Sequence, residues 1–191
     1  MASILKSSQV MSSEIKFENL MTSMMNIVLE NSGAERGALV LKNSVSTNNG
    51  GANGYSKDTK DAVCAYHQQG NKEAITYTPP RKLSESDDLV SSRIINHTIH
   101  TRESIFISDV EQDQRFAVGP WFERSGRKSI ISMPIIHKNM VVGCLFIEGS
   151  VGLFTQRHIT VLGLLCQQMG ISITNAFLFM SVKQVTNDKI K

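Results

Sequence analysis

The sequence predicts an α+β domain built on a central antiparallel sheet of about six strands. Three observations predict it: helix-patterned segments at both ends of the 191-residue chain, short apolar runs in the middle, and short turns between those runs. The N- and C-terminal helices are expected to pack on one face of the sheet. A further helix and a long loop are expected to cover the other face.

The first 31 residues are predicted to be helical. Their apolar residues recur at steps of three and four, which is the stripe of an amphipathic helix: Phe17, Leu20, Met21, Met24, Ile27 and Val28. Gly33 supplies the stop, because glycine tolerates the left-handed conformation that ends many helices. A break near Ser12 and Ser13 predicts two helices in this region instead of one.

Three strands are expected next. Residues 37–41 form an apolar run, and residues 62–66 and 74–78 alternate between apolar and polar positions. The Pro pair at 79–80 is expected to end the third of these strands. Residues 43–60 are rich in Asn, Gly and Ser, and we expect a long flexible loop insertion there.

A helix is predicted over residues 89–101, and a short strand over 104–108. Three side chains before the helix are candidate N-caps: Ser84, Ser86 and Asp87. A long polar segment follows over residues 109–127. Residues 129–149 are then expected to form a hairpin turning at 137–139, where asparagine tolerates the left-handed conformation.

Two residues of this hairpin depart from a plain apolar core. Pro134 cannot donate to the ladder, so it marks a break or bulge. Gly143 is expected to let neighbouring backbones approach closely. A second long helix should begin near residue 155, with a stripe made of Leu162, Leu165, Met169, Ile173, Ala176 and Met180. The expected division is 1–31 for the N-terminal helices, 32–154 for the core and 155–191 for the C-terminal helix.

The composition excludes several classes of protein. The net charge is +3, and the 20 basic residues are interspersed with 17 acidic ones, so the concentrated basic face of a nucleic-acid binder is not expected. No apolar run reaches the roughly 18 residues of a membrane span. The three cysteines are an odd number at wide spacings, which indicates reduced thiols in a cytoplasmic protein.

Four segments resemble a GAF domain: residues 32–41, 104–122, 128–149 and 152–179. Within that family, the stretches SILKSSQVMSSEI, NIVLENSGAERGALVL and LLCQQMGISITNAFLF are most similar to the GAF module of hybrid sensor histidine kinases of fungal type. The resemblance implies a sensory module that precedes a histidine kinase region in a longer parent protein. The chain has neither a phospho-acceptor His motif nor a Gly-rich ATP lid, so no catalysis is expected of it.

The resemblance also implies a place for a small-molecule ligand, between the sheet and its covering helix and loop. The residues at the matching positions are Ser91, Ser92, Ile95, Asp109, Arg115, Phe116, Trp121, Phe122, Ile131, Ser132 and Met133. Apolar and aromatic walls with a few polar groups suit a ligand pocket. The alternative is that the aromatic side chains plug this face and nothing binds. No cofactor is evident, and the identity of any ligand stays open.

Other chemistries fit less well. The acidic pair of cyclic-nucleotide GAF domains is missing after Phe154, and no cysteine has the context of a bilin attachment. A GAF-like free methionine sulfoxide reductase needs a reactive thiolate. Cys144 stands among apolar neighbours, which raises the pKa of a thiol and favours a structural role. Cys64 and Cys166 fall in a predicted strand and helix.

Two polar constellations remain. His97 and His100 share a helix face, but no further ligand at a suitable spacing completes a metal site, so none is expected. The isolated His67, His137 and His158 are expected at the surface. Asp109 and Arg115 could brace the long loop through a charge-assisted hydrogen bond, and a structural role is favoured for Asp113 with Arg115.

The C-terminal helix carries more apolar residues than one contact needs, among them Leu164 and Ile171. Excess apolar surface of this kind predicts an interface, and a homodimer through the terminal helices is expected. Alternatively, a first helix over residues 4–11 covers the excess within one chain. The predicted function is a non-catalytic input module that signals through its terminal helices. A ligand-free structural dimerisation domain and the reductase are the alternatives.

Overall fold

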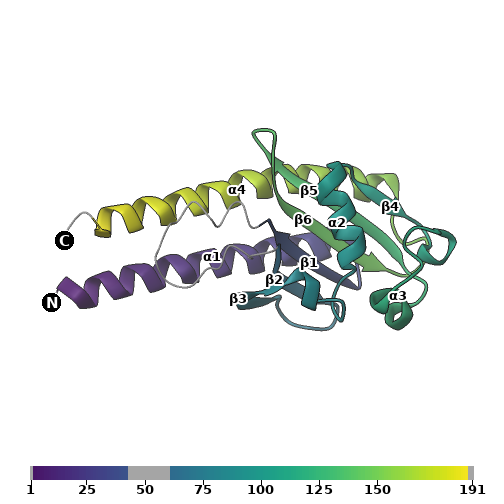
Figure 1. Cartoon of the computed structure of the whole chain (residues 1–191), viewed down its shortest axis with the longest axis horizontal. Helices are drawn as coiled ribbons and strands as arrows, with labels where there is room; N and C mark the ends of the chain where they lie inside the picture. Colours follow the sequence, from purple (N-terminus) through teal and green to yellow (C-terminus); the bar gives the residue numbers. More distant parts are fainter. Residues whose placement is uncertain (1, 43–60, 189–191) are drawn as a thin grey trace.

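A six-stranded antiparallel sheet forms the centre of the protein, in the strand order β3-β2-β1-β6-β5-β4 (Figure 1). The computed structural model describes residues 2–42 and 61–188, so the loop expected over 43–60 lies outside the described residues. The α+β class and the six strands confirm the sequence-based prediction. The strands are β1 (Arg36–Leu41), β2 (Ala62–Gln68), β3 (Ile75–Lys82), β4 (Ile105–Ile107), β5 (Ser129–His137) and β6 (Met140–Gly149).

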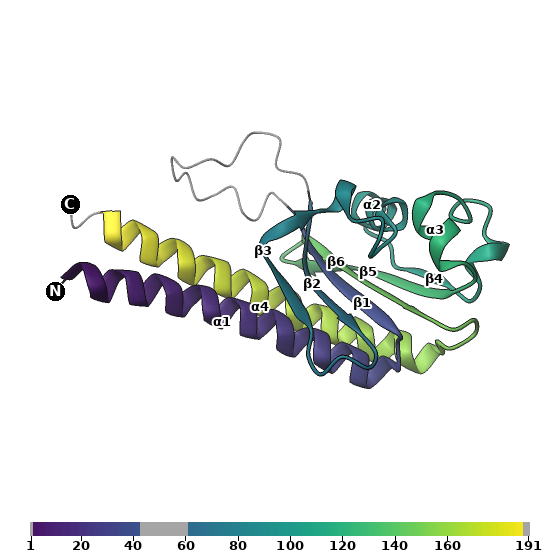
Figure 2. The same cartoon turned by 90° about the horizontal axis from the view of Figure 1, so that it is seen from below.

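Helices cover both faces of the sheet (Figure 2). The long helices α1 (Ala2–Ser32) and α4 (Gln156–Asp188) lie together on one face, which we call the terminal-helix face. The short helices α2 (Ser92–Thr101) and α3 (Pro120–Ser125) lie on the opposite, covered face. Two single 3-10 turns, η2 (Leu83–Glu85) and η3 (Val110–Gln112), connect the elements of this second layer.

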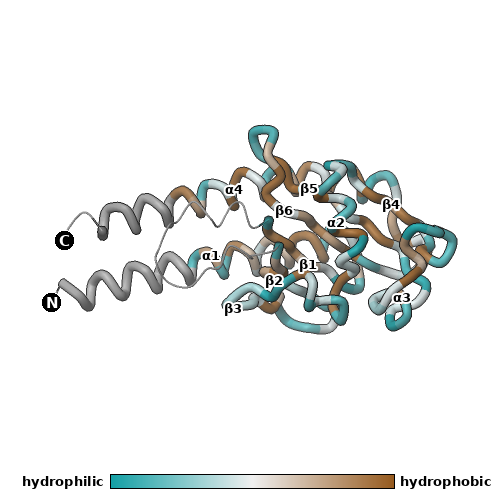
Figure 3. Tube along the Cα trace, in the orientation of Figure 1, coloured by the Kyte–Doolittle hydropathy of each residue, from teal (hydrophilic) through white to brown (hydrophobic). Residues whose placement is uncertain are grey.

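This arrangement follows from strands that are apolar on both sides. Every residue of β6 after Met140 is buried, and Figure 3 shows hydrophobic residues running along the central strands. Because successive side chains of a strand point to opposite faces, β6 supplies two cores at once. Leu145 and Ile147 pack under the terminal helices, whereas Cys144 and Phe146 pack under α2 and α3. Both faces therefore need a cover.

The expected break at Ser12 and Ser13 is wrong, because α1 is one continuous helix over Ala2–Ser32. Serine in a helix interior costs only a fraction of a kcal/mol relative to alanine, about 0.5 kcal/mol, whereas starting a second helix requires a new nucleus. The stop at Gly33 is confirmed. Gly33 has a φ of 66°, and its N–H donates to the Leu29 carbonyl at 2.9 Å.

The expectation that the Pro pair ends the third strand is also wrong, because β3 continues to Lys82. Tyr66 and Ala65 of β2 pair with residues 75 and 76, and the register then shifts before the pairs Val63 with Arg81 and Ala62 with Lys82. The prolines fall inside this irregularity on an edge strand. No ladder hydrogen bond is required of them there.

Helix α2 begins later than predicted, and Ser91 is its N-cap. The Ser91 hydroxyl oxygen accepts from the Ile94 N–H at 3.3 Å. The predicted caps lie upstream, where Ser86 Oγ donates to the Lys82 carbonyl at 2.7 Å instead. Asp87 assists the helix start without capping it, because its Oδ1 accepts from the Ser92 hydroxyl at 2.7 Å.

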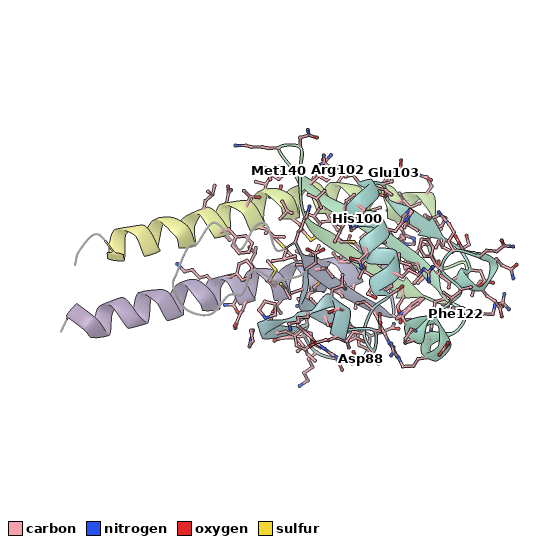
Figure 4. All side chains as sticks on the ribbon, in the orientation of Figure 1. Asp88, His100, Arg102, Glu103, Phe122 and Met140 are labelled. Carbon is pink, nitrogen blue, oxygen red and sulfur yellow. The ribbon has the colours of Figure 1, made fainter. Side chains whose placement is uncertain are left out.

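The β5–β6 hairpin turns at Lys138 and Asn139, which both have positive φ (48° and 63°), as two-residue hairpin turns require. The hairpin is tied to the end of α2, because Arg102 Nη1 donates to the Asn139 carbonyl at 3.1 Å. Arg102 and Met140 lie at this shared corner in Figure 4. The irregularity predicted at Pro134 occurs one residue further on, between Ile135 and the next residue.

Helices α1 and α4 run antiparallel, so both chain termini lie at one end of the molecule (Figures 1 and 2). Phe17 and Phe177 join them through ring centroids 5.2 Å apart. The expectation that no segment is long and apolar enough for a membrane span is wrong for Gln156–Leu178 of α4, which meets that criterion by length and composition alone. In this fold its inner stripe packs on the sheet through Leu162, Cys166, Met169 and Ile173.

A matched pair of glycine substitutions tests the close approach of β6 to β1. A Cβ at Gly143 would lie 2.2 Å from the Val40 carbonyl oxygen, so Gly143→Ala should lower the free energy of unfolding by about 1–3 kcal/mol. At Gly163 of α4, an added Cβ would meet no neighbouring side chain or strand within 4 Å. Gly163→Ala should therefore raise the free energy of unfolding by about 1 kcal/mol, because alanine favours a helix more than glycine does.

Urea unfolding of the two variants measures both effects. A Gly143→Ala protein that unfolds at the wild-type urea concentration would contradict the close strand approach.

Candidate functional site

The covered face of the sheet is the place where the sequence predicts a ligand, and it is densely packed. Ile95 of α2, Phe116 and Trp121 are all buried in its core. Trp121 meets the Phe146 ring edge to face, with centroids 5.7 Å apart. These aromatic side chains fill the space between the sheet and its cover, so a ligand there would have to displace them. Phe122 is half-buried at the rim of α3 (Figure 4).

A short chain of buried polar groups crosses this face. Thr98 of α2 and Ser132 of β5 are hydrogen-bonded through their hydroxyl oxygens at 2.7 Å, and Ser132 also contacts the Cys144 sulfur at 3.3 Å. The Thr98 hydroxyl additionally donates to the Ile94 carbonyl at 3.1 Å. All three side chains are buried and have partners. They therefore hold α2 on strands β5 and β6.

The structure separates three residues that the sequence grouped into one pocket floor. Ser132 faces α2, whereas Ile131 and Met133 belong to the core under α1 and α4. Neighbouring residues of a strand point to opposite faces, so these three cannot line one space. The placement of Ile131 and Met133 in the ligand pocket is therefore wrong.

The two serines at the start of α2 have local partners. Ser91 is buried as the N-cap of the helix. Ser92 is held by Asp87 through both its hydroxyl and its backbone N–H. Their hydroxyl groups organise the helix start, which accounts for both side chains without a ligand.

Asp109 and Arg115 do not form the hydrogen bond that was expected between them, because each of them bonds to another residue. Arg127 Nε donates to Asp109 Oδ2 at 3.1 Å. Arg115 donates through Nε and Nη2 to the two Asp113 oxygens, at 3.1 and 2.8 Å. These hydrogen bonds hold the pKa of each carboxyl below its usual range. The Arg115 guanidinium also stacks over Phe116, 4.8 Å from the ring centroid.

These ion pairs brace the long loop from outside. They border an open hollow of about 590 Å³ beside β4, lined by Phe106, Ile107, Ser108, Asp109, Gln112, Asp113, Gln114 and Arg115. The hollow therefore takes in Asp109 and Arg115 of the predicted pocket set. It lies apart from Ser132 and Trp121, which are buried in the interior.

The three cysteines are free and buried. Burial raises the pKa of the Cys64 and Cys144 thiols to about 12 and that of the Cys166 thiol further still. A nucleophilic cysteine needs the opposite shift, since the thiolate is the reactive form.

The histidines have ordinary structural contacts. His97 meets the Phe116 ring at 5.5 Å, and His100 Nδ1 is hydrogen-bonded to the Asn96 carbonyl at 2.7 Å. His67 is buried, contrary to the surface position expected for it, because β2 is an inner strand covered by α1. Across residues 2–42 and 61–188, no three His, Cys, Asp or Glu side chains are grouped as metal ligands.

Glu148 is the residue that the sequence interpretation missed. It is the second-last residue of β6, with only 1% of its surface exposed, and its Oε2 accepts from Trp121 Nε1 at 3.0 Å. Arg36 Nη1 lies 3.7 Å from Oε1, and no donor among the described residues forms a hydrogen bond with Oε1. Burial raises the pKa of this carboxyl above its usual value. Its spacing of two and four residues from Phe146 and Cys144 was the signal that places it on the covered face.

A second candidate site is the outward face of α4. Three large apolar residues there stay exposed at a spacing of seven: Leu164 (63%), Ile171 (42%) and Leu178 (59%). The inner stripe of the same helix is buried against the sheet. Apolar residues at a spacing of seven occupy one of the two heptad positions through which one helix packs along another.

Comparisons with known proteins agree with this geometry. The family model described as "GAF domain" matches residues 16–174. Two relatives from Schizosaccharomyces pombe are "Peroxide stress-activated histidine kinase mak3", 28% identical over 98% of this chain, and "Peroxide stress-activated histidine kinase mak2", 26% identical over the whole chain. The chain spans 7% and 8% of their lengths.

Solved structures show the same fold at low identity. The GAF domain from Acinetobacter phosphoenolpyruvate-protein phosphotransferase is 14% identical, with a TM-score of 0.57, and the match covers 92% of this chain and 96% of that one. The type II free methionine-R-sulfoxide reductase from Thermoplasma acidophilum is 12% identical, with a TM-score of 0.56 over 85% and 95% of the two chains. At sequence identities this low, the comparison shows a common fold and says nothing about a common activity.

The family expectation is confirmed, including the likeness to hybrid kinases, because "Hybrid signal transduction histidine kinase G" from Dictyostelium discoideum is 32% identical over 49% of this chain and 3% of its own length. This chain belongs to the GAF domain family and is homologous to sensor regions of histidine kinases.

Proposed function

We propose that this chain is a non-catalytic input module of a histidine kinase, and that it works as a homodimer held together along α4. The observation that carries the proposal is the exposed seam Leu164, Ile171 and Leu178 on a helix whose other side is already buried. Both chain termini lie at one end of the molecule, which suits passage of a signal to neighbouring regions of a longer protein. A cytoplasmic location belongs to the same proposal.

A second copy of the chain is the occupant that fits this seam best. A seven-residue spacing keeps a narrow apolar seam facing a partner helix over two heptads. Asn175 lies on the same exposed side of α4, between Ile171 and Leu178. A single polar Asn within an apolar seam can fix the register of two identical helices, because the two amides pair.

We propose dimerisation, and not small-molecule binding, as the main role of the chain. The polar groups of the covered face, Thr98 and Ser132, bond to each other, and the aromatic side chains fill the remaining space. This packing favours the plugged, ligand-free interpretation over a preformed pocket. Dimer contacts, and not an interior ligand, then supply the main input to the kinase.

The reductase alternative requires a reactive thiol. The solved reductase with this fold shares only 12% identity with the chain. The thiols of Cys64, Cys144 and Cys166 are buried with raised pKa values, which disfavours thiolate chemistry at neutral pH. For the same reason we infer that any response to peroxide, after which two relatives are named, does not begin at these cysteines.

The dimer interface can be tested by replacing the seam. The triple variant Leu164→Ser, Ile171→Ser and Leu178→Ser should shift the chain from dimer to monomer in sedimentation equilibrium, because it removes the apolar area that association buries. A matched control replaces three other exposed apolar residues, Ile75, Val118 and Val151, with serine. The control should stay dimeric, and a seam variant that also stays dimeric would refute the proposal.

The cysteines can be tested by alkylation and turnover. Iodoacetamide should leave the native chain unlabelled and modify all three cysteines in urea, because each thiol is buried and protonated in the fold. Incubation with free methionine sulfoxide and a thiol reductant should give no turnover. Measurable turnover that is lost on replacing Cys64, Cys144 or Cys166 with serine would instead establish the reductase.

A further inference from the structure

The contact between Trp121 and Glu148 lies at a junction of the fold. Trp121 comes from α3 in the covering layer, and Glu148 is the second-last residue of the central strand β6. Figure 2 shows α3 near the end of the sheet that lies away from the two chain termini, where α1 ends and α4 begins. We propose that this contact is a proton-sensitive latch, which holds α3 on the sheet when Glu148 is protonated and loosens when Glu148 is ionised.

The burial of Glu148 depends on α3. Its side chain is 1% exposed beneath the buried Trp121 ring, and it has one hydrogen bond, from the indole N–H at 3.0 Å. Within the part of the chain that the structure describes, no donor reaches the buried Oε1 atom. The indole N–H favours the ionised carboxylate, but burial opposes it more strongly, because one donor does not replace the water that a charged carboxylate loses. Lifting α3 would return the carboxylate to water.

The charges around Glu148 reduce this penalty but do not remove it. Arg36 of β1 lies 3.7 Å away and is 37% exposed, so solvent screens the pair. Lys128, at the entrance to β5, also favours the ionised form, but its ammonium is bonded to Glu35 at 2.6 Å. Glu35 itself opposes ionisation, and Tyr66 of β2 completes the set of titratable neighbours.

Burial is the largest of these effects, so the pKa of Glu148 is raised above its ordinary value of 4.5. The closed state therefore binds the proton more tightly than an opened or unfolded state does. By linkage, the closed state loses stability as the pH rises from about 4.5 to the raised pKa. At pH values above the raised pKa of Glu148, the carboxyl is ionised even in the closed state. The unfavourable free energy of burying this charge then favours opening of α3.

The latch is placed where it can affect both terminal helices. Arg36 and Glu148 are register partners of β1 and β6, and the Glu35 N–H donates to the Glu148 carbonyl at 2.9 Å. The chain leaves α1 only a few residues before Glu35. After Glu148, the chain turns through Gly149, where a Cβ would lie 2.3 Å from Leu153, and enters α4 at Gln156. A shift at Glu148 therefore reaches the end of α1 and the start of α4.

The chain offers a direct probe, because Trp121 is its only tryptophan. Acrylamide quenching of tryptophan emission, measured at a series of pH values in the folded range, reports how open α3 is. In the wild-type protein, quenching should rise with pH in a single titration. In Glu148→Gln, quenching should stay low and independent of pH, because the side chain cannot ionise.

Two further variants make the test specific. Arg36→Gln removes the cation that favours ionisation, so the transition should move to higher pH. Glu35→Gln removes a nearby carboxyl that is not the latch, and its transition should persist, displaced to lower pH. Circular dichroism at each pH confirms that the protein stays folded. A flat wild-type titration, or a transition that survives in Glu148→Gln, would overturn the latch.

Discussion

The structure depends on one constraint: the central sheet is apolar on both faces. Every residue of β6 after Met140 is buried, so alternate side chains enter two separate cores. Neither core can form until helices cover it, because exposed apolar area on this scale is unfavourable in water. Helices α1 and α4 cover one face and α2 and α3 cover the other, and both candidate sites follow from this division.

The division also decides what the covered face can do. Short helices and a loop offer little apolar surface, so large side chains from the loop, Phe116 and Trp121, complete that core. Three of the polar groups inside it differ in their hydrogen bonds. Thr98 and Ser132 are hydrogen-bonded to each other, whereas Glu148 has one bonded and one unbonded oxygen among the described residues. Glu148 is held by one indole N–H and a partly exposed cation, so this end of the face is the easier one to open.

The sequence could predict the helices and strands because their apolar periods are long and regular, as in the stripe from Phe17 to Val28. A strand buried on both sides shows no alternation, so the sequence does not tell which of its two faces lies under which helices. Ile131 and Met133 were grouped with Ser132 by family position, although strand geometry places them on the opposite face. Ion-pair partners predicted from closeness along the chain were also wrong. Asp109 bonds to Arg127, 18 residues away, and not to Arg115. Glu148 was missed because it stands inside an apolar run.

The same constraint shapes how α4 is held on the sheet. Its inner stripe contacts a core rich in sulfur, with Met21, Met25, Met133 and Met169 among the buried residues. Methionine side chains are flexible and polarizable, so this contact tolerates small shifts of a helix over the sheet. Gly170 is the exception, since a Cβ there would lie 2.9 Å from the Ile136 carbonyl oxygen. Gly170 therefore sets how closely α4 approaches β5, and a larger side chain there would push the helix away from the strand.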